Sequence, residues 1–463
     1  MTVDWEKIFA AMKADCRGYQ SIVNALIRAV EEGELRSGDR LPTQRFVAQR
    51  LGMAIGTITR AYAELEHLGL VVGKVGSGTY VSNFAEQRSL PRQGADRASA
   101  VVDMTVSRPP PQGAAVHLAN ALRLLSKRHD LVDLLGTEPP NGWIQHRMAA
   151  AKWMSRRLEG VEPDQIVMCN GVQHALSTIF AAFTRAGDVV ATENLNYPGI
   201  KLLADLHRIR LVGVAMDSEG LRTEKLEQAC NRTAVRFVLC SPTVHNPTTI
   251  TMSVERRLAL AALARKHNFL IIENDILGMM PAAPLPALRS LAPHHTIYVT
   301  GLSKAVAAGL RVGFIVASSA QIPPLMSGIR STTWMPQPLM LEIFSTWIAS
   351  NAIEEMIAWH RNEIAARLAL ARRFLSGQDL RGDPSAYHVW LTLPGDWTSD
   401  QFVECAYNEG VWLSPSDTFI IDTDVSPNAA RISLGAPNSR ERLAQGLEVL
   451  ALIFERGAGR LRS

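Results

Sequence analysis

The chain has 463 residues, of which 47% are hydrophobic and 20% are charged, and its formal net charge at pH 7 is +4. This length predicts two or three domains with ample apolar material for a large core, and so small a net charge does not by itself indicate a nucleic-acid partner. No apolar run approaches the roughly 20 residues that span a membrane, and the N-terminal residues do not resemble a signal peptide. The five cysteines are scattered without a CxxC pair, so we expect no metal site, no disulfide framework and a cytoplasmic location.

Residues 1–82 are predicted to form a small helical domain that ends in a hairpin. Apolar residues recur at helical spacing in three stretches, 19–32, 45–51 and 55–68. Thr43 can cap the second helix, and Gly52 and Gly69 can end the second and third. Two short strands around Gly76 and Gly78 follow. This is the element order of a winged helix-turn-helix.

Three motifs of this region resemble the GntR-type DNA-binding domain: Asp39-Arg40-Leu41-Pro42-Thr43-Gln44-Arg45, Thr57-Ile58-Thr59-Arg60-Ala61-Tyr62 and Gly69-Leu70-Val71. The resemblance implies that the helix at 55–68 enters the major groove of a double-stranded DNA operator. The residues that it places near phosphates, base edges or the minor groove are Arg45, Thr57, Thr59, Arg60, Gly76 and Ser77. Residues 40–80 hold five basic and two acidic residues, a local net charge of +3 that favours phosphate contact. Ala54-Ile55 stands where the family often has Ser-Arg.

Residues 83–102 lack periodicity and are predicted to be a linker. From residue 103 to about 458 we expect a second domain, in which short β-branched runs alternate with amphipathic stretches. The runs that predict strands are 166–168, 189–191, 211–214, 234–239, 270–272, 297–299 and 314–317. This alternation predicts an α/β fold, in which a mostly parallel sheet lies between helices and ligand sites lie at the carboxyl ends of its strands.

Polar and aromatic residues follow these predicted strands in order. Asn170-Gly171 opens a helix whose first amides suit a phosphate, and Tyr197-Pro198 follows the next strand. The later strands precede the segment 241–249, then Glu273-Asn274-Asp275, and finally Ser303-Lys304. A lysine on a loop is usually only solvated, but at a strand end it can form a Schiff base, and Arg311 nearby can hold a phosphate.

The ordered series resembles the fold-type I aminotransferases, which use pyridoxal 5'-phosphate (PLP), and the resemblance covers nearly the whole second domain. It implies that this domain carries a smaller C-terminal subdomain and that Lys304 forms the Schiff base. Ser303, Arg311 and the amides of Val172 and Gln173 would hold the phosphate. Tyr197 would stack on the pyridine ring, Asn246 would bond its hydroxyl, and Arg431 would bind a substrate or effector carboxylate. Considered one at a time, each of these three residues could equally be an ordinary turn or surface residue with no role in binding.

The chain departs from that family at four positions. Asn274 stands where an aspartate normally faces the ring nitrogen, and a neutral amide cannot hold that nitrogen protonated unless Asp275 substitutes for the missing carboxylate. Leu277 and Thr137 replace tyrosines, and Gly301 replaces a serine. Each change removes a hydrogen bond, so we expect PLP binding but weakened transamination.

Together the two domains resemble the MocR-type transcriptional regulators. The resemblance implies a homodimer, often with swapped DNA readers, that binds DNA and responds to an amino compound or to PLP itself, with no membrane association. Two alternatives stay open at this point. One is an active PLP-dependent aminotransferase with an accessory DNA-binding domain, and the other is a DNA-binding protein whose large domain only dimerises.

Overall fold

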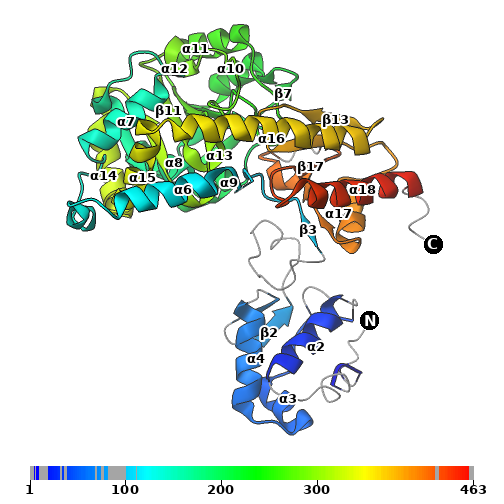
Figure 1. Ribbon diagram of the computed structural model, residues 1–463. Coiled ribbons are helices and arrows are strands. Elements are labelled where there is room, and N and C mark those ends of the chain that lie inside the picture. Colours follow the sequence, from blue (N-terminus) through cyan, green and yellow to red (C-terminus); the bar gives the residue numbers. More distant parts are fainter. Residues whose placement is uncertain are drawn as a thin grey trace. The chain divides into compact units, whose positions relative to one another are not determined.

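The computed structural model (Figure 1) describes residues 5, 7–9, 19–31, 34–35, 39–67, 70–74, 78–81, 101–110, 112–422 and 427–457. The chain divides into two compact units, Met1–Gln93 and Gly94–Ser463. The division falls within the stretch 83–102 that is predicted to be a linker, most of which lies outside the described residues. No helix among the described residues is both long and apolar enough to cross a lipid bilayer.

The first unit contains a helix-turn-helix followed by a two-stranded hairpin. Among its described residues the elements are α2 (Tyr19–Glu31), α3 (Gln44–Leu51), α4 (Ile55–His67), β1 (Val71–Lys74) and β2 (Gly78–Val81). The Thr43 hydroxyl accepts a hydrogen bond from the Phe46 amide at the start of α3, and Gly52 ends that helix at φ 69°. Both signals were expected from the sequence. The strands β1 and β2 pair antiparallel, which confirms the predicted hairpin.

A seven-stranded sheet organises the second unit. Its spatial order is β4 (Ile166–Cys169), β12 (Gly313–Val316), β11 (Thr296–Gly301), β10 (Leu270–Asn274), β9 (Val235–Cys240), β5 (Val189–Glu193) and β6 (Arg210–Val214). All seven predicted strands are present. The strand β12 runs antiparallel to both of its neighbours, and the pairs among β11, β10, β9, β5 and β6 are parallel.

Helices cover both faces of this sheet because alternate residues of its strands point to opposite sides. On one face, Val167 and Ile315 pack in a cluster with α8 (Val172–Phe183), α9 (Gly199–His207) and α14 (Ile322–Thr332). On the other, Ile166 and Phe314 pack with α6 (Gln112–Leu125), α7 (Ile144–Met154), α15 (Pro338–Ala349) and α16 (Ala352–Phe374). Towards the β6 edge, a further cluster includes α10 (Thr223–Arg232), α11 (Val254–His267) and α12 (Leu288–Leu291).

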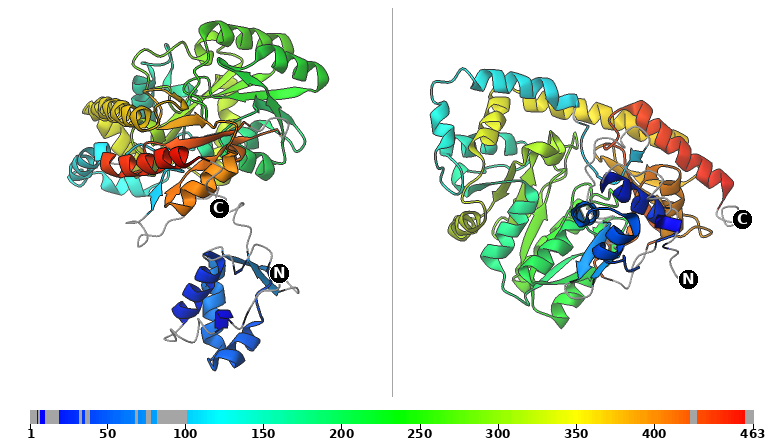
Figure 2. Two further views of the ribbon diagram at one scale, coloured as in Figure 1. Left: turned by 90° about the vertical axis from the view of Figure 1, so that its right-hand side faces the viewer. Right: turned by 90° about the horizontal axis from the view of Figure 1, so that it is seen from below.

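A smaller four-stranded sheet lies near the C-terminus, as the resemblance implied. It has the order β13 (Asp379–Gly382), β14 (His388–Thr392), β17 (Ala429–Ser433) and β16 (Ser414–Pro415). The helices α17 (Ser399–Asn408) and α18 (Arg440–Arg456) pack with this sheet in one cluster (Figure 2). The strand β3 (Val102–Asp103) pairs with β15 (Val411–Trp412), so the start of the second unit lies against its end.

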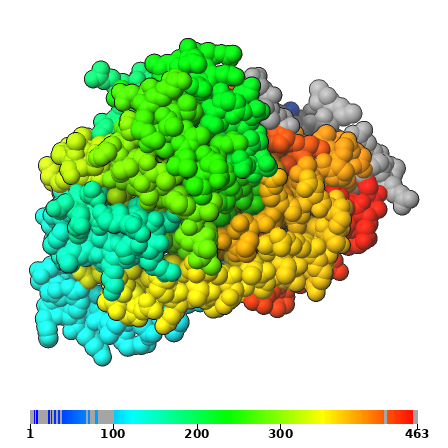
Figure 3. Space-filling model, turned by 90° about the horizontal axis from the view of Figure 1, so that it is seen from above, coloured from blue at the N-terminus to red at the C-terminus, as the bar shows by residue number. Residues whose placement is uncertain are grey.

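Short elements complete the part of the chain that the structure describes. They are β7 (Met216–Asp217), β8 (Gly220–Leu221), α13 (Leu302–Ala305) and five short 3-10 helices, η1 (Leu131–Leu135), η2 (Pro163–Gln165), η3 (Ala308–Leu310), η4 (Ser319–Gln321) and η5 (Ser416–Phe419). The long helix α16 runs along the surface of the second unit beside α6 (Figure 3).

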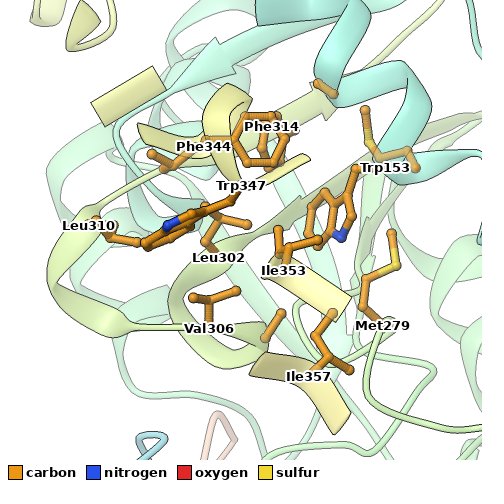
Figure 4. Packing of buried hydrophobic residues seen from close by; sticks show 14 of the residues in the cluster. Trp153, Met279, Leu302, Val306, Leu310, Phe314, Phe344, Trp347, Ile353 and Ile357 are labelled. Atoms are coloured by element: carbon orange, nitrogen blue, oxygen red, sulfur yellow. The ribbon is translucent and has the colours of Figure 1, made fainter. Parts of the chain in front are cut away.

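The core beneath α13 holds the segment that carries Lys304. Leu302, Val306 and Leu310 all point into the cluster that contains Trp347 and Phe344 (Figure 4). Burial of these side chains stabilises the segment on the sheet by about 1.5–3 kcal/mol each. The polar residues of this segment, Ser303 and Lys304, are therefore held on the side away from this core, towards the carboxyl edge of the sheet.

Candidate functional site

One edge of the large sheet gathers most of the predicted site residues of the second unit. The parallel strands end there, and the antiparallel strand β12 begins there. The segments that meet at this edge are 170–173 after β4, 194–198 after β5, 241–249 after β9, 274–275 at the end of β10, 301–304 after β11 and 311–312 before β12. Parallel strands of an α/β sheet bring their binding residues together in this way.

Lys304 lies on α13, immediately after the buried strand β11. Its amine donates a hydrogen bond to the Ser107 carbonyl, which comes from the start of the second unit. Burial, together with the positive charges of Arg431 and Arg311, lowers the pKa of Lys304 to about 7. A large fraction of this amine is therefore neutral near pH 7, which is the form that attacks a carbonyl carbon.

A concave group of helix amides and an arginine, called the anion cup below for the ligand that its chemistry suits, lies beside this lysine. The helix α8 starts at Val172, and its N-cap residue Gly171 provides no side-chain hydrogen bond, so the first amides of the helix point to the site without partners within the helix. The Arg311 guanidinium lies against Gly171, where an added Cβ would be 2.8 Å from Nη2. An added Cβ on Gly313 would lie 2.7 Å from the Gly171 carbonyl carbon. The cup therefore needs glycine on both sides of this contact.

Gly301 also lies in this tightly packed region. A Cβ at this position would be 2.7 Å from the Val312 carbonyl oxygen and 3.2 Å from the Gly313 Cα. Contacts this short with backbone atoms are not relieved by a side-chain movement. The serine that the aminotransferase family usually has here would require this backbone to move, which the sequence alone does not reveal.

Tyr197 lies over the same edge, with 39% of the residue exposed. Its ring packs on Gly199, where an added Cβ would lie 2.3 Å from the ring carbon Cε1. Burial raises the pKa of Tyr197, whereas the charges of Arg311 and Arg431 act to lower it. The tyrosine is therefore close to both predicted anion-binding arginines. Gln173 donates a hydrogen bond to the Gly199 carbonyl at 2.9 Å, which ties α8 to the tyrosine loop.

Arg431 and Asn246 form a second polar group at the site. Arg431 lies on β17 of the smaller sheet, and its Nη1 donates to the Asn246 Oδ1 at 2.8 Å. The guanidinium also donates to the Thr105 carbonyl and lies 4.6 Å from the centre of the Phe419 ring. Burial lowers the pKa of Arg431 to about 10, so the group still carries its charge at neutral pH. A buried, charged guanidinium of this kind is suited to a carboxylate.

Asn274 and Asp275 have different surroundings. The Asp275 carboxylate accepts hydrogen bonds from Arg157 at 2.7 Å and from the Tyr298 hydroxyl at 3.0 Å, so it belongs to an interior ion pair. Asn274 is 7% exposed, and its amide oxygen is buried without a hydrogen-bond partner. The Oδ1 atom of Asp275 also has no hydrogen-bond partner, but Asp275 is fully buried and its charge is paired with Arg157. This pairing favours Asn274 over Asp275 as the group that faces a ligand.

Several supporting residues were not predicted. Glu193 accepts hydrogen bonds from the Ser241 amide and the Asn196 side chain, both at 2.8 Å, and burial raises the pKa of Glu193 to about 7. Asn196 in turn accepts a hydrogen bond from the Tyr197 amide at 2.7 Å. This network fixes the loops after β5 and β9. Glu193 does follow a predicted strand, but only the three-dimensional pairing shows that it points inward.

A histidine near Lys304 was also missed. The buried His388 lies on β14, and its Nδ1 is 3.1 Å from the Ser107 hydroxyl. The charges of Arg431 and Lys304, added to the larger effect of burial, lower the pKa of His388 well below its usual range. The imidazole is therefore neutral at physiological pH. No sequence signal links residues 107 and 388, because they are brought together only by the fold.

In the first unit, Thr57, Thr59 and Arg60 of the predicted DNA-contact residues lie on α4, the second helix of the helix-turn-helix, and Arg45 lies on α3, the first. Arg45, Thr59 and Arg60 are exposed, whereas Thr57 is half-buried. The Thr59 hydroxyl lies 2.8 Å from the Gln44 Oε1, and the Arg60 guanidinium lies 4.2 Å from the centre of the Tyr19 ring. Gly76 and Ser77 lie outside the described residues.

Comparison with known families divides the chain into the same two parts as the two compact units of the fold. Residues 101–450 match the family described as aminotransferase class I and II. Residues 18–81 match the bacterial regulatory proteins of the gntR family.

Relatives and solved structures agree with both matches. The chain is 29% identical over 443 residues to the uncharacterized HTH-type transcriptional regulator YdeF of Bacillus subtilis, with 96% of each chain covered. It is 24% identical to the vitamin B6 salvage pathway transcriptional repressor PtsJ of Salmonella typhimurium, over 82% of this chain and 86% of that one. An archaeal alanine:glyoxylate aminotransferase has the same fold, with a TM-score of 0.70, 24% identity and coverage of 78% of this chain and 92% of that one.

Proposed function

This chain belongs to the class I and II aminotransferase family, and because it also carries a GntR-family domain, as MocR-type regulators do, we propose that it is a DNA-binding transcriptional regulator. Its second unit binds PLP and senses an amino compound or PLP itself. The observation that carries the proposal is the lowered pKa of Lys304, beside an anion cup and a buried arginine, in a chain similar to a transcriptional regulator over 96% of its length. As a regulator of transcription it acts in the cytoplasm.

The residues at the sheet edge fit PLP. Bound PLP supplies an aldehyde for a reversible imine link and a ring that withdraws electrons. Arg311 and the first amides of α8 would hold the phosphate, with Ser303 as a further hydrogen-bond donor. Tyr197 would stack on the ring, and Asn246, whose oxygen accepts a hydrogen bond from Arg431, would offer its amide nitrogen to the ring hydroxyl.

The same site favours sensing over efficient transamination. Asn274 offers a neutral amide where a carboxylate would hold the ring nitrogen protonated, and the charge of Asp275 is already paired with Arg157, which bonds its Oδ2 atom together with Tyr298. A weaker electron sink slows proton removal from a bound amino compound. Arg431 would bind the carboxylate of that compound, so binding is retained while turnover is reduced.

Cofactor binding is tested by absorbance. Purified wild-type protein with added PLP should show a visible band from the imine link, and borohydride reduction should fix one PLP mass per chain. Lys304→Ala should lose both signals, whereas the exposed Lys225→Ala should keep them. A wild-type protein that stays colourless with added PLP would overturn the sensor proposal in favour of a large domain that only dimerises. Turnover of amino and keto acids at ordinary enzymatic rates would instead favour the aminotransferase.

DNA binding is tested by gel shift with the intergenic region upstream of the gene. Arg45→Ala and Arg60→Ala should weaken binding, because each removes an exposed positive charge beside the predicted groove contact. Arg265→Ala, an exposed arginine on α11, serves as the control. Undiminished binding by both of the first two variants would reject the assigned DNA face.

A second copy of the chain is the remaining proposed partner. Exposed apolar side chains gather on α6, η1 and α7, namely Val116, Leu122, Leu124, Leu131, Val132, Leu135, Ile144 and Met148. A set of this size on neighbouring elements is typical of a protein interface. We assign it to the homodimer.

A further inference from the structure

The first turn of α4 presents an apolar surface to solvent. Ile55 is 49% exposed, and its neighbours Ala54 and Gly56 are exposed as well. The opposite face of the helix is buried through Ile58 and Ala61. Ile55 is thus excluded from the core of its own domain although its side chain is large and apolar. Its place, at the N-terminal end of the second helix of a helix-turn-helix, is the part that contacts base edges.

Charged and hydroxyl groups lie to either side of this surface. Thr59, one turn after Ile55, is bonded to Gln44 of α3, so this flank of α4 faces α3. Arg60 lies over the Tyr19 ring of α2, so it occupies the other flank. Both Arg45 and Arg60 are exposed. The arginines are therefore placed at the sides, where phosphates run, and the first turn between them offers mainly methyl groups.

Gly56 gives an independent indication that something approaches this turn closely. An added Cβ would meet no atom of the protein within 4 Å, and the residue does not have the positive φ that favours glycine. A glycine in a helix interior costs about 1 kcal/mol relative to alanine, and Gly56, in the first turn of α4, carries a smaller cost of the same sign. Neither packing nor backbone geometry within the described residues accounts for it. Close approach of a ligand to the backbone does.

We propose that Ile55 reads thymine, by packing against the C5-methyl group in the major groove, and that Gly56 lets the helix come close enough for this contact. The inference rests on the proposed DNA-binding function and specifies which base this position selects. An isoleucine cannot hydrogen-bond a base edge, and the thymine methyl is the apolar group that the major groove displays. The operator half-site should therefore contain a fixed A·T pair whose thymine faces Ile55.

The test uses the full-length protein and duplexes that it selects from a random library. Each thymine of the selected half-site is replaced in turn by deoxyuridine, which removes only the methyl group. One replacement should weaken wild-type binding about three- to fivefold, the effect of one buried methyl group. Ile55→Ala should bind the thymine and deoxyuridine duplexes equally at that position. Phe46→Ala, which removes an exposed apolar side chain of α3, should keep the wild-type discrimination.

Two further variants sharpen the result. Ile55→Arg should shift the selected base at that position towards guanine, because arginine pairs with the guanine edge. Gly56→Ala should raise the melting temperature of the protein but weaken binding to every selected duplex. The inference is overturned if no deoxyuridine replacement weakens wild-type binding, or if the loss is the same in Ile55→Ala. Failure to select any sequence at all would instead overturn the DNA-binding function itself.

Discussion

Lys304 is the residue whose surroundings matter most for the proposed function, because they determine the protonation state of its amine. Its amine would ordinarily hold a proton up to about pH 10.5, but burial and the two arginines bring its pKa to about 7. Burying a charged amine beside like charges destabilises the protonated form. The neutral, nucleophilic form therefore appears as the pH rises through about 7, whereas an exposed lysine becomes neutral near pH 10.5.

The pH dependence of PLP capture tests this environment. The rate at which the apoprotein forms its visible band should rise about fivefold between pH 6 and pH 7 and level off above pH 8, following the neutral fraction of an amine of pKa about 7. Stopped-flow absorbance across a series of buffers measures it. A rate that keeps rising tenfold per pH unit to pH 10 would show an ordinary lysine.

Asn274 sets the expected balance between sensing and catalysis. Replacing it with aspartate in Asn274→Asp should speed the loss of the visible band on addition of an amino acid by about tenfold, because a carboxylate favours the protonated ring nitrogen. Asn274→Ala, with no polar group, should stay as slow as the wild type. Single-turnover absorbance measures the rate. No acceleration in Asn274→Asp would mean that this side chain does not face the ring.

The order of the site residues along the chain predicted which of them lie near one another, but it did not predict the distances between them. Lys304, Arg311, Tyr197, Asn246 and Arg431 were all expected at one site, and contacts or shared electrostatic effects on pKa connect them. The contact of Gly301 with the Val312 carbonyl could not be predicted. It depends on the distance between two backbone segments, about which the sequence carries no direct signal.

At the scale of secondary-structure elements, the contact between the start of α8 and the start of β12 forms the anion cup. Gly171 at the start of α8 and Gly313 at the start of β12 are in backbone contact. This contact places the first amides of the helix next to Arg311. Any side chain at either position would separate the two halves of the cup.

Gly313→Ala tests this contact. An added Cβ would lie 2.7–3.0 Å from the backbone of Gly171, so PLP affinity should fall at least tenfold, and the free energy of unfolding should fall by about 1–3 kcal/mol. Gly309→Ala is the matched control, because its Cβ would meet nothing within 4 Å. Fluorescence titration with PLP and urea unfolding measure the two effects. Equal behaviour of both variants would contradict the assigned role.

The elements were easier to predict than their directions. Seven β-branched runs identified the seven strands of the large sheet because each is buried and bounded by helical patterns. Nothing in the run 314–317 shows that β12 is antiparallel, since strand direction depends on the length and path of the connection from β11. The strands of the smaller sheet are not among the seven predicted runs, because they are short and mixed with polar residues.

At the scale of the whole molecule, the apolar surface on α6, η1 and α7 predicts a dimer. Leu135 is 87% exposed and Val132 is 72% exposed. A charge at both positions would be desolvated in an interface, so Val132→Asp with Leu135→Asp should convert the dimer to a monomer in light scattering. Leu258→Asp on α11, at the opposite side of the second unit (Figure 1), should leave the mass unchanged. A double variant that keeps the wild-type mass would place the interface elsewhere.

The central claim is that occupancy of the Lys304 site controls DNA binding. Coupling between two sites of a protein typically amounts to 1–3 kcal/mol, a change of about 5- to 150-fold in affinity. The most direct measurement is the fluorescence anisotropy of a selected operator duplex, titrated with wild-type protein and with Lys304→Ala, each with and without PLP. We predict that PLP changes the Kd of the wild type at least fivefold and leaves that of Lys304→Ala unchanged. A wild-type Kd that is the same with and without PLP, and with an amino compound added, would contradict the claim.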